Sequence, residues 1–214
     1  MKKGKRILAA FLAVLMVVAI MPFTSFSGIF TSKAKAAESG KKYTFEGTEL
    51  EAAAAGKYTD GQAVTAGTDG YFTFYMSAKT KIDSSDKTWE DGYACKQRVN
   101  FGGKADVANM KNLVSFKTSN AAKVKVYWVE GGDDNRQIAI FGSTGDVVTK
   151  TEVTAAKNAA VVSTLELADA GTYYLGGLEN NNYIFKIEVE ETAAVEEPVV
   201  KEYELDGAKL EAAA

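Results

Sequence analysis

Short runs of alternating hydrophobic and polar residues cover most of the chain beyond residue 40, separated by clusters of Gly, Asn, Asp and Ser. Runs with a period of two that are rich in β-branched and aromatic side chains are typical of β-strands. Helix signals are scarce, and only the alanine-rich stretch Glu49–Ala55 predicts a short helical turn. Strands are expected near Tyr43–Glu46, Tyr71–Met76, Lys79–Asp83, Tyr93–Phe101, Leu113–Thr118, Lys123–Glu130, Arg136–Phe141, Val147–Val153, Val161–Leu167, Thr172–Leu175 and Tyr183–Glu190.

The alternation also assigns side chains to the two faces of each strand, because successive residues point to opposite sides. Trp128 alternates with polar neighbours in step with Val124 and Val126, so we expect it in the core. Gln137–Phe141 is apolar on both faces, which is typical of a central strand. The strand near 93–101 should turn inward Cys95, Val99 and Phe101. The strand near 183–190 should turn inward Tyr183, Phe185, Ile187 and Val189.

Many short strands at this spacing indicate a β-sandwich or a β-barrel. No proline occurs between Pro22 and Pro198, so no segment between them is barred from a central strand. Asp169–Leu175 resembles the tyrosine corner of immunoglobulin-like sandwiches, in which a Tyr hydroxyl bonds back to nearby backbone. We therefore predict an all-β fold, an antiparallel β-sandwich of jelly-roll or immunoglobulin-like type.

The first 36 residues have the organisation of a secretory signal peptide. A basic start at residues 2–6 precedes the uncharged apolar run Ile7–Met21, and Ala34-Lys35-Ala36 fits the small-x-small cleavage pattern. The run is shorter than the roughly 20 residues that a membrane-spanning helix needs, and an uncleaved anchor is the alternative. A cleaved signal peptide predicts a secreted, extracellular or cell-surface-associated protein that meets the membrane only transiently.

A repeat near the end of the chain predicts the domain organisation. Residues 41–54 read KKYTFEGTELEAAA and residues 201–214 read KEYELDGAKLEAAA, with eight of the fourteen positions identical. We expect a signal peptide at 1–36, a β-sandwich module at 37–190, an acidic linker at 191–200 and the start of a second, truncated copy at 201–214. The alternative is a tail strand that completes this domain or pairs with a neighbouring copy.

Charge and composition narrow the function classes. The chain has 25 Lys and Arg against 28 Asp and Glu, and removal of the six basic residues in 1–36 would change its net charge from −3 to 19 − 28 = −9. Such an acidic surface argues against nucleic acid and anionic lipid as partners. With no His and one Cys, the chain has no Ser-His-Asp or Cys-His machinery and no internal disulfide. No carboxylate pair or phosphate-binding glycine motif stands out, so we expect a non-catalytic module.

A polar row on the outward face of the strand near 93–101 is the main candidate for ligand binding. Side chains at alternate positions lie about 7 Å apart along a strand and could span a sugar or uronate chain. Arginine forms bidentate hydrogen bonds to carboxylates, and lysine supplies a point charge. An ordinary solvated face is the alternative. The row consists of Lys96, Arg98 and Asn100.

Two further groups of side chains complete the candidate residues. Trp89 and Lys87 lie in a polar stretch, predicted to be a loop, where Trp89 either stacks on a sugar ring or folds back as a lid on the core. Asp133 and Asp134 offer oxygen ligands of the kind that Ca²⁺ uses, but the EF-hand spacing is missing and turns favour Asp and Asn for backbone reasons alone. We predict no cofactor and keep Ca²⁺ as the alternative.

Several stretches together resemble the β-sandwich, carbohydrate-binding-type modules that occur, often in tandem, in secreted pectate lyases and other polysaccharide-degrading proteins. The resemblance covers residues 43–190. It implies contacts to acidic glycan from Lys96, Arg98 and Arg136. The stretches that carry it are Gln97–Gly103, Val124–Tyr127, Asn135–Phe141, Ala170–Gly176 and Asn182–Ile187.

The resemblance predicts a secreted, non-catalytic module that tethers a larger carbohydrate-active protein to plant cell-wall or related polysaccharide, pectin included. The alternative is a structural or cell-surface repeat that spaces or displays other domains without binding glycan. An outward face with no aromatic side chain near Lys96, Arg98 and Arg136 would favour this alternative, because sugar rings stack on aromatic rings.

Overall fold

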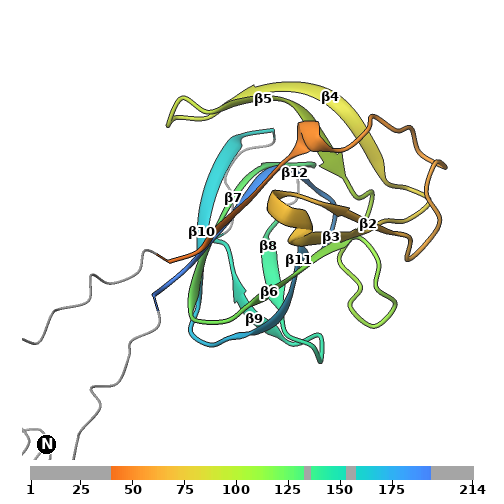
Figure 1. Ribbon diagram of the computed structural model, residues 1–214. Coiled ribbons are helices and arrows are strands. Elements are labelled where there is room, and N and C mark those ends of the chain that lie inside the picture. Colours follow the sequence, from red (N-terminus) through yellow and green to blue (C-terminus); the bar gives the residue numbers. More distant parts are fainter. Residues whose placement is uncertain (1–39, 133–135, 153–157, 194–214) are drawn as a thin grey trace, which may run out of the picture. The chain divides into compact units, whose positions relative to one another are not determined.

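Two antiparallel six-stranded β-sheets form the part of the chain that this computed structural model describes, residues 40–132, 136–152 and 158–193 (Figure 1). Sheet A contains β1 (Lys42–Glu46), β4 (Lys81–Thr88), β5 (Ala94–Asn100), β7 (Ala122–Glu130), β10 (Ala160–Leu167) and β12 (Asn182–Glu191). Sheet B contains β2 (Ala63–Ala66), β3 (Phe72–Tyr75), β6 (Leu113–Thr118), β8 (Ile138–Phe141), β9 (Val147–Lys150) and β11 (Gly171–Gly177). Two 3₁₀ turns lie in the segment between β1 and β3, which also contains β2. The turn η1 (Gly47–Glu49) follows β1, and η2 (Thr68–Gly70) precedes β3.

The strand order is that of a jelly roll. Sheet A runs β10-β7-β12-β5-β4, and β1 pairs with β12. Sheet B runs β2-β3-β6-β11-β8-β9. Strands β5 to β12 thus form two four-stranded halves, β10-β7-β12-β5 and β6-β11-β8-β9, which is the eight-stranded double-sheet arrangement. The predicted all-β antiparallel sandwich is confirmed, and of its two predicted types the order matches the jelly roll.

The main core lies between the two sheets. Trp128 of β7 is fully buried in it, as predicted, and its Nε1 donates a hydrogen bond to Ser163 Oγ on β10 at 3.0 Å. Phe45 of β1 packs against Phe74 of β3 with ring centroids 4.4 Å apart, which joins sheet A to sheet B. Buried aromatic side chains of this size carry much of the hydrophobic stabilisation of a core.

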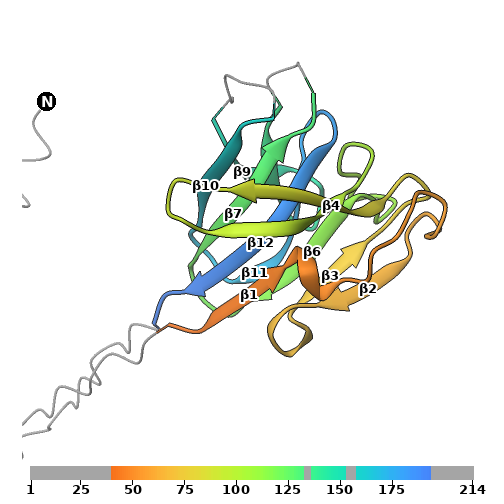
Figure 2. The same ribbon diagram turned by 90° about the horizontal axis from the view of Figure 1, so that it is seen from above.

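A second, smaller core lies on the outer face of sheet A, beneath the β4–β5 hairpin. Figure 1 and Figure 2 show the hairpin arching across the strands of this sheet. The ring of Trp89 lies 5.0 Å from that of Phe185 and 5.6 Å from that of Tyr127, and its Nε1 donates to Val161 O at 3.0 Å. Its buried members are Trp89, Cys95, Tyr127, Val129 and Phe185.

The second core shows that the predicted face assignment was wrong for Phe185 and Cys95. The register of β12 against β7 shifts between Ile184 and Lys186, so Phe185 belongs to the second core while Ile187 belongs to the main one. A bulge resets the alternation of a strand, and residues on either side of it no longer share the predicted parity. Cys95 of β5 likewise belongs to the second core, whereas Val99 of the same strand belongs to the main core.

The tip of the hairpin is fastened to sheet A through Asp91. Its carboxylate accepts hydrogen bonds from Tyr127 OH at 2.7 Å, from Lys125 Nζ at 3.1 Å and from the backbone N–H of Tyr93 at 3.1 Å. These donors, Tyr127 foremost, lower the pKa of Asp91 from its ordinary 3.8 to about 2.

Acid should therefore loosen the hairpin. Because the pKa of Asp91 is lower in the folded state, its stabilising effect is complete above about pH 4 and is lost as the pH falls towards 2. We expect Asp91→Asn to lower the melting temperature at pH 7 and to flatten its decline between pH 4 and pH 2. Thermal unfolding of both proteins across this range, followed by tryptophan fluorescence, measures this. Parallel declines in the two proteins would contradict the role of Asp91.

Most predicted strands are present, with three differences. β2 was not predicted, because its small side chains give a weak pattern. The stretch 49–55 forms no helix beyond η1; instead, Ala53 makes a β-bridge with Ile82. The predicted loop around Trp89 is partly strand, since β4 continues to Thr88. The tyrosine corner is confirmed, because Tyr173 OH donates to Asp169 O at 2.8 Å.

Four connections meet at one end of sheet A, which we call the loop end. The register pairs Lys81 with Asn100, Asn100 with Tyr183, and Asn182 with Glu130. Hence the β3–β4, β5–β6, β7–β8 and β11–β12 connections all begin or finish there. Loops gathered on a rigid sheet edge are a common place for binding residues.

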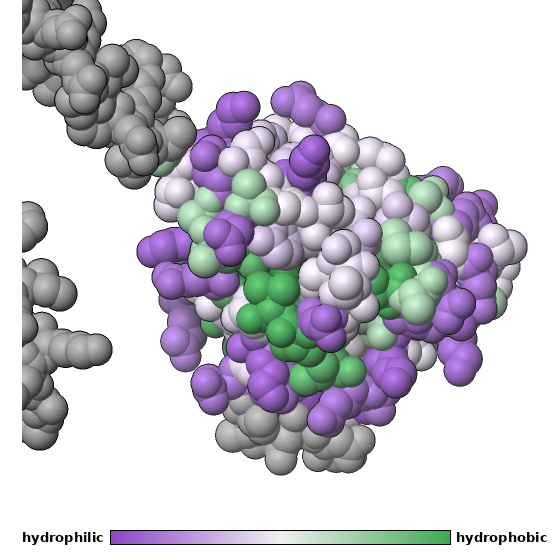
Figure 3. Space-filling view, turned by 90° about the horizontal axis from the view of Figure 1, so that it is seen from below, coloured by the Kyte–Doolittle hydropathy of each residue, from purple (hydrophilic) through white to green (hydrophobic). Residues whose placement is uncertain are grey.

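The surface carries few large apolar side chains. In the view of Figure 3, a limited hydrophobic area is surrounded by hydrophilic residues. Within the described ranges, the exposed large hydrophobic residues are Val147 and Val148 of the edge strand β9. The described residues form no helix that is long and apolar enough to span a bilayer. The predicted signal peptide at 1–36, the linker beyond residue 193 and the second copy at 201–214 lie outside the described residues.

Candidate functional site

Arg98 is fixed on the outer face of β5 by two neighbours. Its Nε donates to Asp83 Oδ1 on β4 at 2.6 Å, and its Nη2 lies 3.4 Å from Asp83 Oδ2. The same guanidinium lies over the Tyr183 ring of β12, with Cζ 3.9 Å from the ring centroid. The side chain of Arg98 is 19% exposed. A carboxylate and an aromatic ring therefore hold this cation in one orientation at the surface.

Asn100, two residues further along β5, is hydrogen-bonded to the β11–β12 connection. Its Oδ1 accepts from Asn181 Nδ2 at 2.8 Å and from the backbone N–H of Gly102 at 3.1 Å. Asn181 Oδ1 also approaches the Gly102 N–H, at 3.2 Å. Gly102 has a φ of +76°, and a Cβ there would lie 2.6 Å from the Cβ of Lys79. Only glycine fits this turn without strain, which keeps the two asparagines in register.

Arg136 reaches the same corner from the β7–β8 connection. Its Nη1 donates to Asn181 O at 2.6 Å, and its backbone N–H donates to Glu130 Oε1 at 3.1 Å. A Cβ at Gly131 would lie 3.1 Å both from Arg136 Nη1 and from Tyr183 Cζ, so the guanidinium and the ring border the same glycine. Because Gly131 and Gly132 have no side chains, this turn leaves room for the guanidinium of Arg136.

These residues form what we call the Arg98 cluster, defined as Asp83, Arg98, Asn100, Arg136, Asn181 and Tyr183. Its members come from four separate parts of the chain and present guanidinium donors, amide groups and a half-buried phenol ring. Such groups are the ones that bind sugar hydroxyls, sugar rings and carboxylates.

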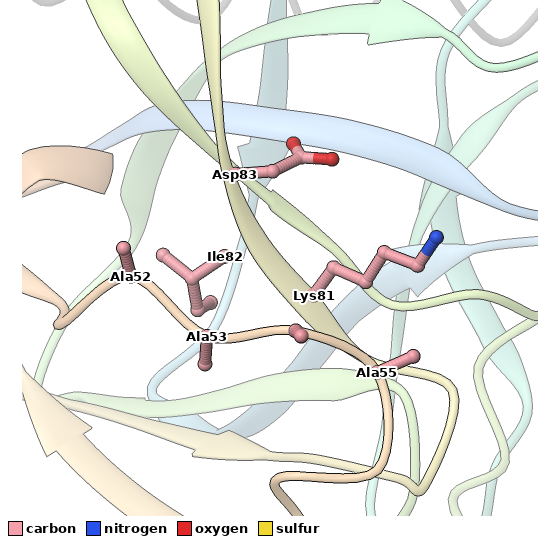
Figure 4. A pocket seen from close by; sticks show the side chains of 7 residues that line it. Ala52, Ala53, Ala55, Lys81, Ile82 and Asp83 are labelled. Atoms are coloured by element: carbon pink, nitrogen blue, oxygen red, sulfur yellow. The ribbon is translucent and has the colours of Figure 1, made fainter.

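A shallow pocket of about 630 Å³ adjoins the cluster at Asp83 (Figure 4). It is lined by the alanines of residues 52–55 and by Lys81, Ile82 and Asp83 of β4. In Figure 4, the side chains of Lys81 and Asp83 extend away from the alanine segment, beside the ribbon of β4. Because the alanine side chains are small, the pocket is shallow and open. Its polar edge continues into the Arg98 cluster through the Asp83–Arg98 pair.

The structure brings three of the six predicted ligand-binding residues together and separates the other three. Arg98, Asn100 and Arg136 belong to the Arg98 cluster. Lys96 is exposed on β5, next to the bulge that shifts the β4 register between Ser84 and Lys87. Lys96 belongs to the β4–β5 hairpin, which Figure 2 shows crossing the strands of sheet A.

Lys87 and Trp89 belong to the hairpin and not to the Arg98 cluster. Lys87 Nζ donates to Asn158 O at 3.2 Å. Trp89 is only 3% exposed, so the expectation that its ring stacks on a ligand is wrong. The alternative, that Trp89 folds back as a lid on a core, is what the structure shows. The physical reason is the apolar outer face of sheet A, which the hairpin covers.

The metal prediction gains no support. Asp133 and Asp134 lie outside the described residues. Among the residues that the structure does describe, no group of three or more acidic, His or Cys side chains could hold a metal ion. Calcium binding therefore stays an untested alternative.

Sequence reasoning missed Asp83, Asn181 and Tyr183. Tyr183 was predicted to face inward, but it packs against the second core beside Arg98. Asp83 ends a predicted strand whose faces the sequence did not assign, and only the register places it beside Arg98. The signal available was the run Asn180-Asn181-Asn182 directly before a strand, because polar residues at strand ends often carry function.

Comparison with known proteins yields likeness in fold only. No family model and no curated protein matches the chain. A solved structure from work on glycan recognition by the Ruminococcus flavefaciens cellulosome is 14% identical, covering 73% of this chain and 98% of its own, with a TM-score of 0.42. The xylan-binding domain CBM22-1 from Paenibacillus barcinonensis is also 14% identical, covering 75% and 100%, with a TM-score of 0.37.

A carbohydrate-binding module of a Cellvibrio mixtus lichenase, solved with cellotriose, is 11% identical and covers 70% of this chain and 96% of its own, with a TM-score of 0.33. With TM-scores below 0.5, these likenesses assign no function. What the chain binds must be inferred from its own residues.

Proposed function

We propose that the chain is a secreted, non-catalytic polysaccharide-binding module that tethers a larger carbohydrate-active protein to plant cell-wall or related glycan. The Arg98 cluster supplies the binding face. The observation that carries the proposal is the position of Tyr183, a half-buried aromatic ring that borders both Arg98 and Arg136. An outward face with no aromatic residue near these arginines would instead have favoured a structural repeat.

The chemistry of the cluster supports an acidic glycan as ligand. Two guanidinium groups, those of Arg98 and Arg136, lie near the loop end of sheet A in a chain whose formal net charge is −3. Arginine binds carboxylates through paired N–H donors, and the amides of Asn100 and Asn181 are suited to ring hydroxyls. A single such site binds weakly, and repetition along a chain would raise the affinity by avidity.

Affinity gel electrophoresis of the protein through pectins, xylan and neutral glucans tests this function. We expect retardation by acidic polysaccharide, weakening as salt is raised, because partly exposed charges are screened. A gel without polysaccharide and a non-binding protein of similar size serve as controls. Equal mobility in every gel would sink the binding function and leave the structural repeat as the interpretation.

A further inference from the structure

A second polar pocket, of about 360 Å³, lies at the loop end between the β3–β4 and β5–β6 connections and the segment around residue 60. Its volume is at the lower limit of the roughly 300–1,000 Å³ that small-molecule sites occupy. The charged and amide residues that line it are Asp60, Lys79, Lys104, Asp106, Lys111 and Asn112. None of them was among the residues predicted to bind a ligand.

The two carboxylates of this pocket are already bound within the protein. Asp60 accepts from Lys111 Nζ at 2.9 Å and from the backbone N–H of Ala78 at 3.0 Å. Asp106 accepts from Asn109 Nδ2 at 2.9 Å and from its backbone N–H at 3.1 Å. These hydrogen bonds hold the pKa of both carboxyls below the ordinary value, so both are ionised at neutral pH.

Two of the three lysines form no ion pair with a described residue, although Lys79 acts electrostatically on Asp60 and Lys104 on Asp106. Lys111 is paired with Asp60, but within the described ranges neither Lys79 nor Lys104 forms an ion pair. Both side chains are exposed at the rim of the pocket. Three lysines against two aspartates leave the lining residues one positive charge in excess, in a chain of net negative charge.

The lining of the pocket includes a buried acceptor that lacks a donor. Asn112 is 5% exposed, and its Nδ2 donates to Lys104 O at 3.1 Å, which fixes the orientation of the amide. Its Oδ1 is buried and receives no hydrogen bond from any described residue. An unsatisfied buried oxygen is costly, and in native proteins such an acceptor is usually satisfied by an ordered water, an ion or a ligand.

The backbone around the pocket is built to hold Asn112 in place. Asn112 has a φ of +57°, a left-handed conformation that asparagine tolerates better than most residues. A Cβ at Gly103 would lie 3.0 Å from Asn112 Nδ2, so the glycine lets the amide approach the chain. The same loop therefore positions the acceptor and, at Lys104, one of the two unpaired cations.

We propose that this pocket is a second ligand site, separate from the Arg98 cluster, which takes a hydroxylated small anion such as a single uronic acid. A ligand hydroxyl donates to Asn112 Oδ1, and the ligand carboxylate lies between the ammonium groups of Lys79 and Lys104. The choice of a uronic acid rests on the proposed function, but none of the residues of this site belongs to the Arg98 cluster, so either site can fail without the other.

Amide chemical shifts in a titration with matched monosaccharides test the site. The probes are the methyl glycosides of galacturonic and glucuronic acid, each beside the neutral methyl galactoside or glucoside. We expect the uronates to move the signals of Gly102, Gly103, Lys104 and Asn112. We also expect roughly three- to tenfold weaker binding of the uronates by Lys104→Ala and by Lys79→Ala, because each loses one charge-assisted contact.

Two controls separate the outcomes. Lys123→Ala removes an exposed lysine at the other end of β7 and should leave the titration unchanged. Arg98→Ala should also leave it unchanged, while weakening retardation by polysaccharide. Shifts that are equal for uronates and neutral sugars, absent for both, or insensitive to Lys79 and Lys104 would overturn the second site. Polysaccharide retardation in the same protein would then still stand as evidence for the Arg98 cluster.

Discussion

Replacing Trp128 with alanine is expected to lower the free energy of unfolding by about 3–5 kcal/mol, the range for aromatic-to-alanine changes in a packed core. Trp128 is fully buried between the sheets, and it heads the buried side chains by volume. Its loss removes a large apolar contact area, leaves a cavity and takes away the hydrogen bond to Ser163 Oγ. A jelly roll of this size has a stability of only about 5–15 kcal/mol, so this single change removes a large fraction of it.

Denaturant unfolding followed by circular dichroism measures this loss, with Trp89→Ala as the matched control. Both changes delete a buried indole, but Trp89 lies in the second core, where the hairpin can settle onto sheet A. We therefore expect the smaller loss for Trp89→Ala, with the m-value unchanged in both variants. A loss within about 1 kcal/mol for Trp128→Ala would contradict its place at the centre of the main core.

The two tryptophans show what a hydrophobic pattern can predict and what it cannot. Trp128 alternates with Val124 and Val126, and a period of two is enough to place it on the inward face of β7. Trp89 follows a polar run, and no local pattern says whether its ring will find a partner. Its partners, Tyr127 and Phe185, belong to strands far along the chain. Burial by a segment that folds back is a tertiary property, and periodicity does not encode it.

The bulge in β12 is a second case of the same limit. Tyr183, Phe185 and Ile187 have the spacing of one face, yet the register shift places Phe185 beneath the hairpin and Ile187 between the sheets. By contrast, Gln137–Phe141 is apolar on both faces, which predicts a central strand, and β8 does lie inside sheet B, between β11 and β9.

The candidate site could be predicted only in part, for a related reason. The outward direction of Arg98 and Asn100 follows from alternation along β5. Their partners follow from the pairing of β5 with β4 and β12, which brings Asp83 and Tyr183 to Arg98. Pairing of distant strands depends on the whole fold. No local pattern predicts that lysines lie around Asn112, because three loops contribute to that pocket.

The structure changes what the basic row means. In the sequence, Lys96 and Arg98 are two cations on one face. In the fold, Arg98 is held by Asp83 and by the Tyr183 ring, whereas Lys96 is exposed on the hairpin. A side chain held in one orientation loses less conformational entropy when it binds a ligand, so the two residues should contribute unequally.

Arg98→Ala is accordingly expected to weaken retardation by acidic polysaccharide at least roughly tenfold in apparent affinity, as at an arginine hot spot, while Lys96→Ala changes it by about twofold or less. Arg98→Lys should fall between them, because lysine keeps the charge but loses the planar fork. Lys123→Ala is the control for the charge change alone. Circular dichroism checks that each variant keeps its fold.

The outcome also bears on Asp83, which accepts from Arg98 Nε at 2.6 Å. If Asp83 positions the guanidinium for a ligand, Asp83→Asn should weaken binding several-fold less than Arg98→Ala does, because the arginine remains but is less firmly oriented. If Asp83 instead neutralises Arg98 and keeps anions away, Asp83→Asn should strengthen binding to acidic glycan. Equal retardation of Arg98→Ala and the unaltered protein would remove the Arg98 cluster from the binding face, whichever way Asp83 acts.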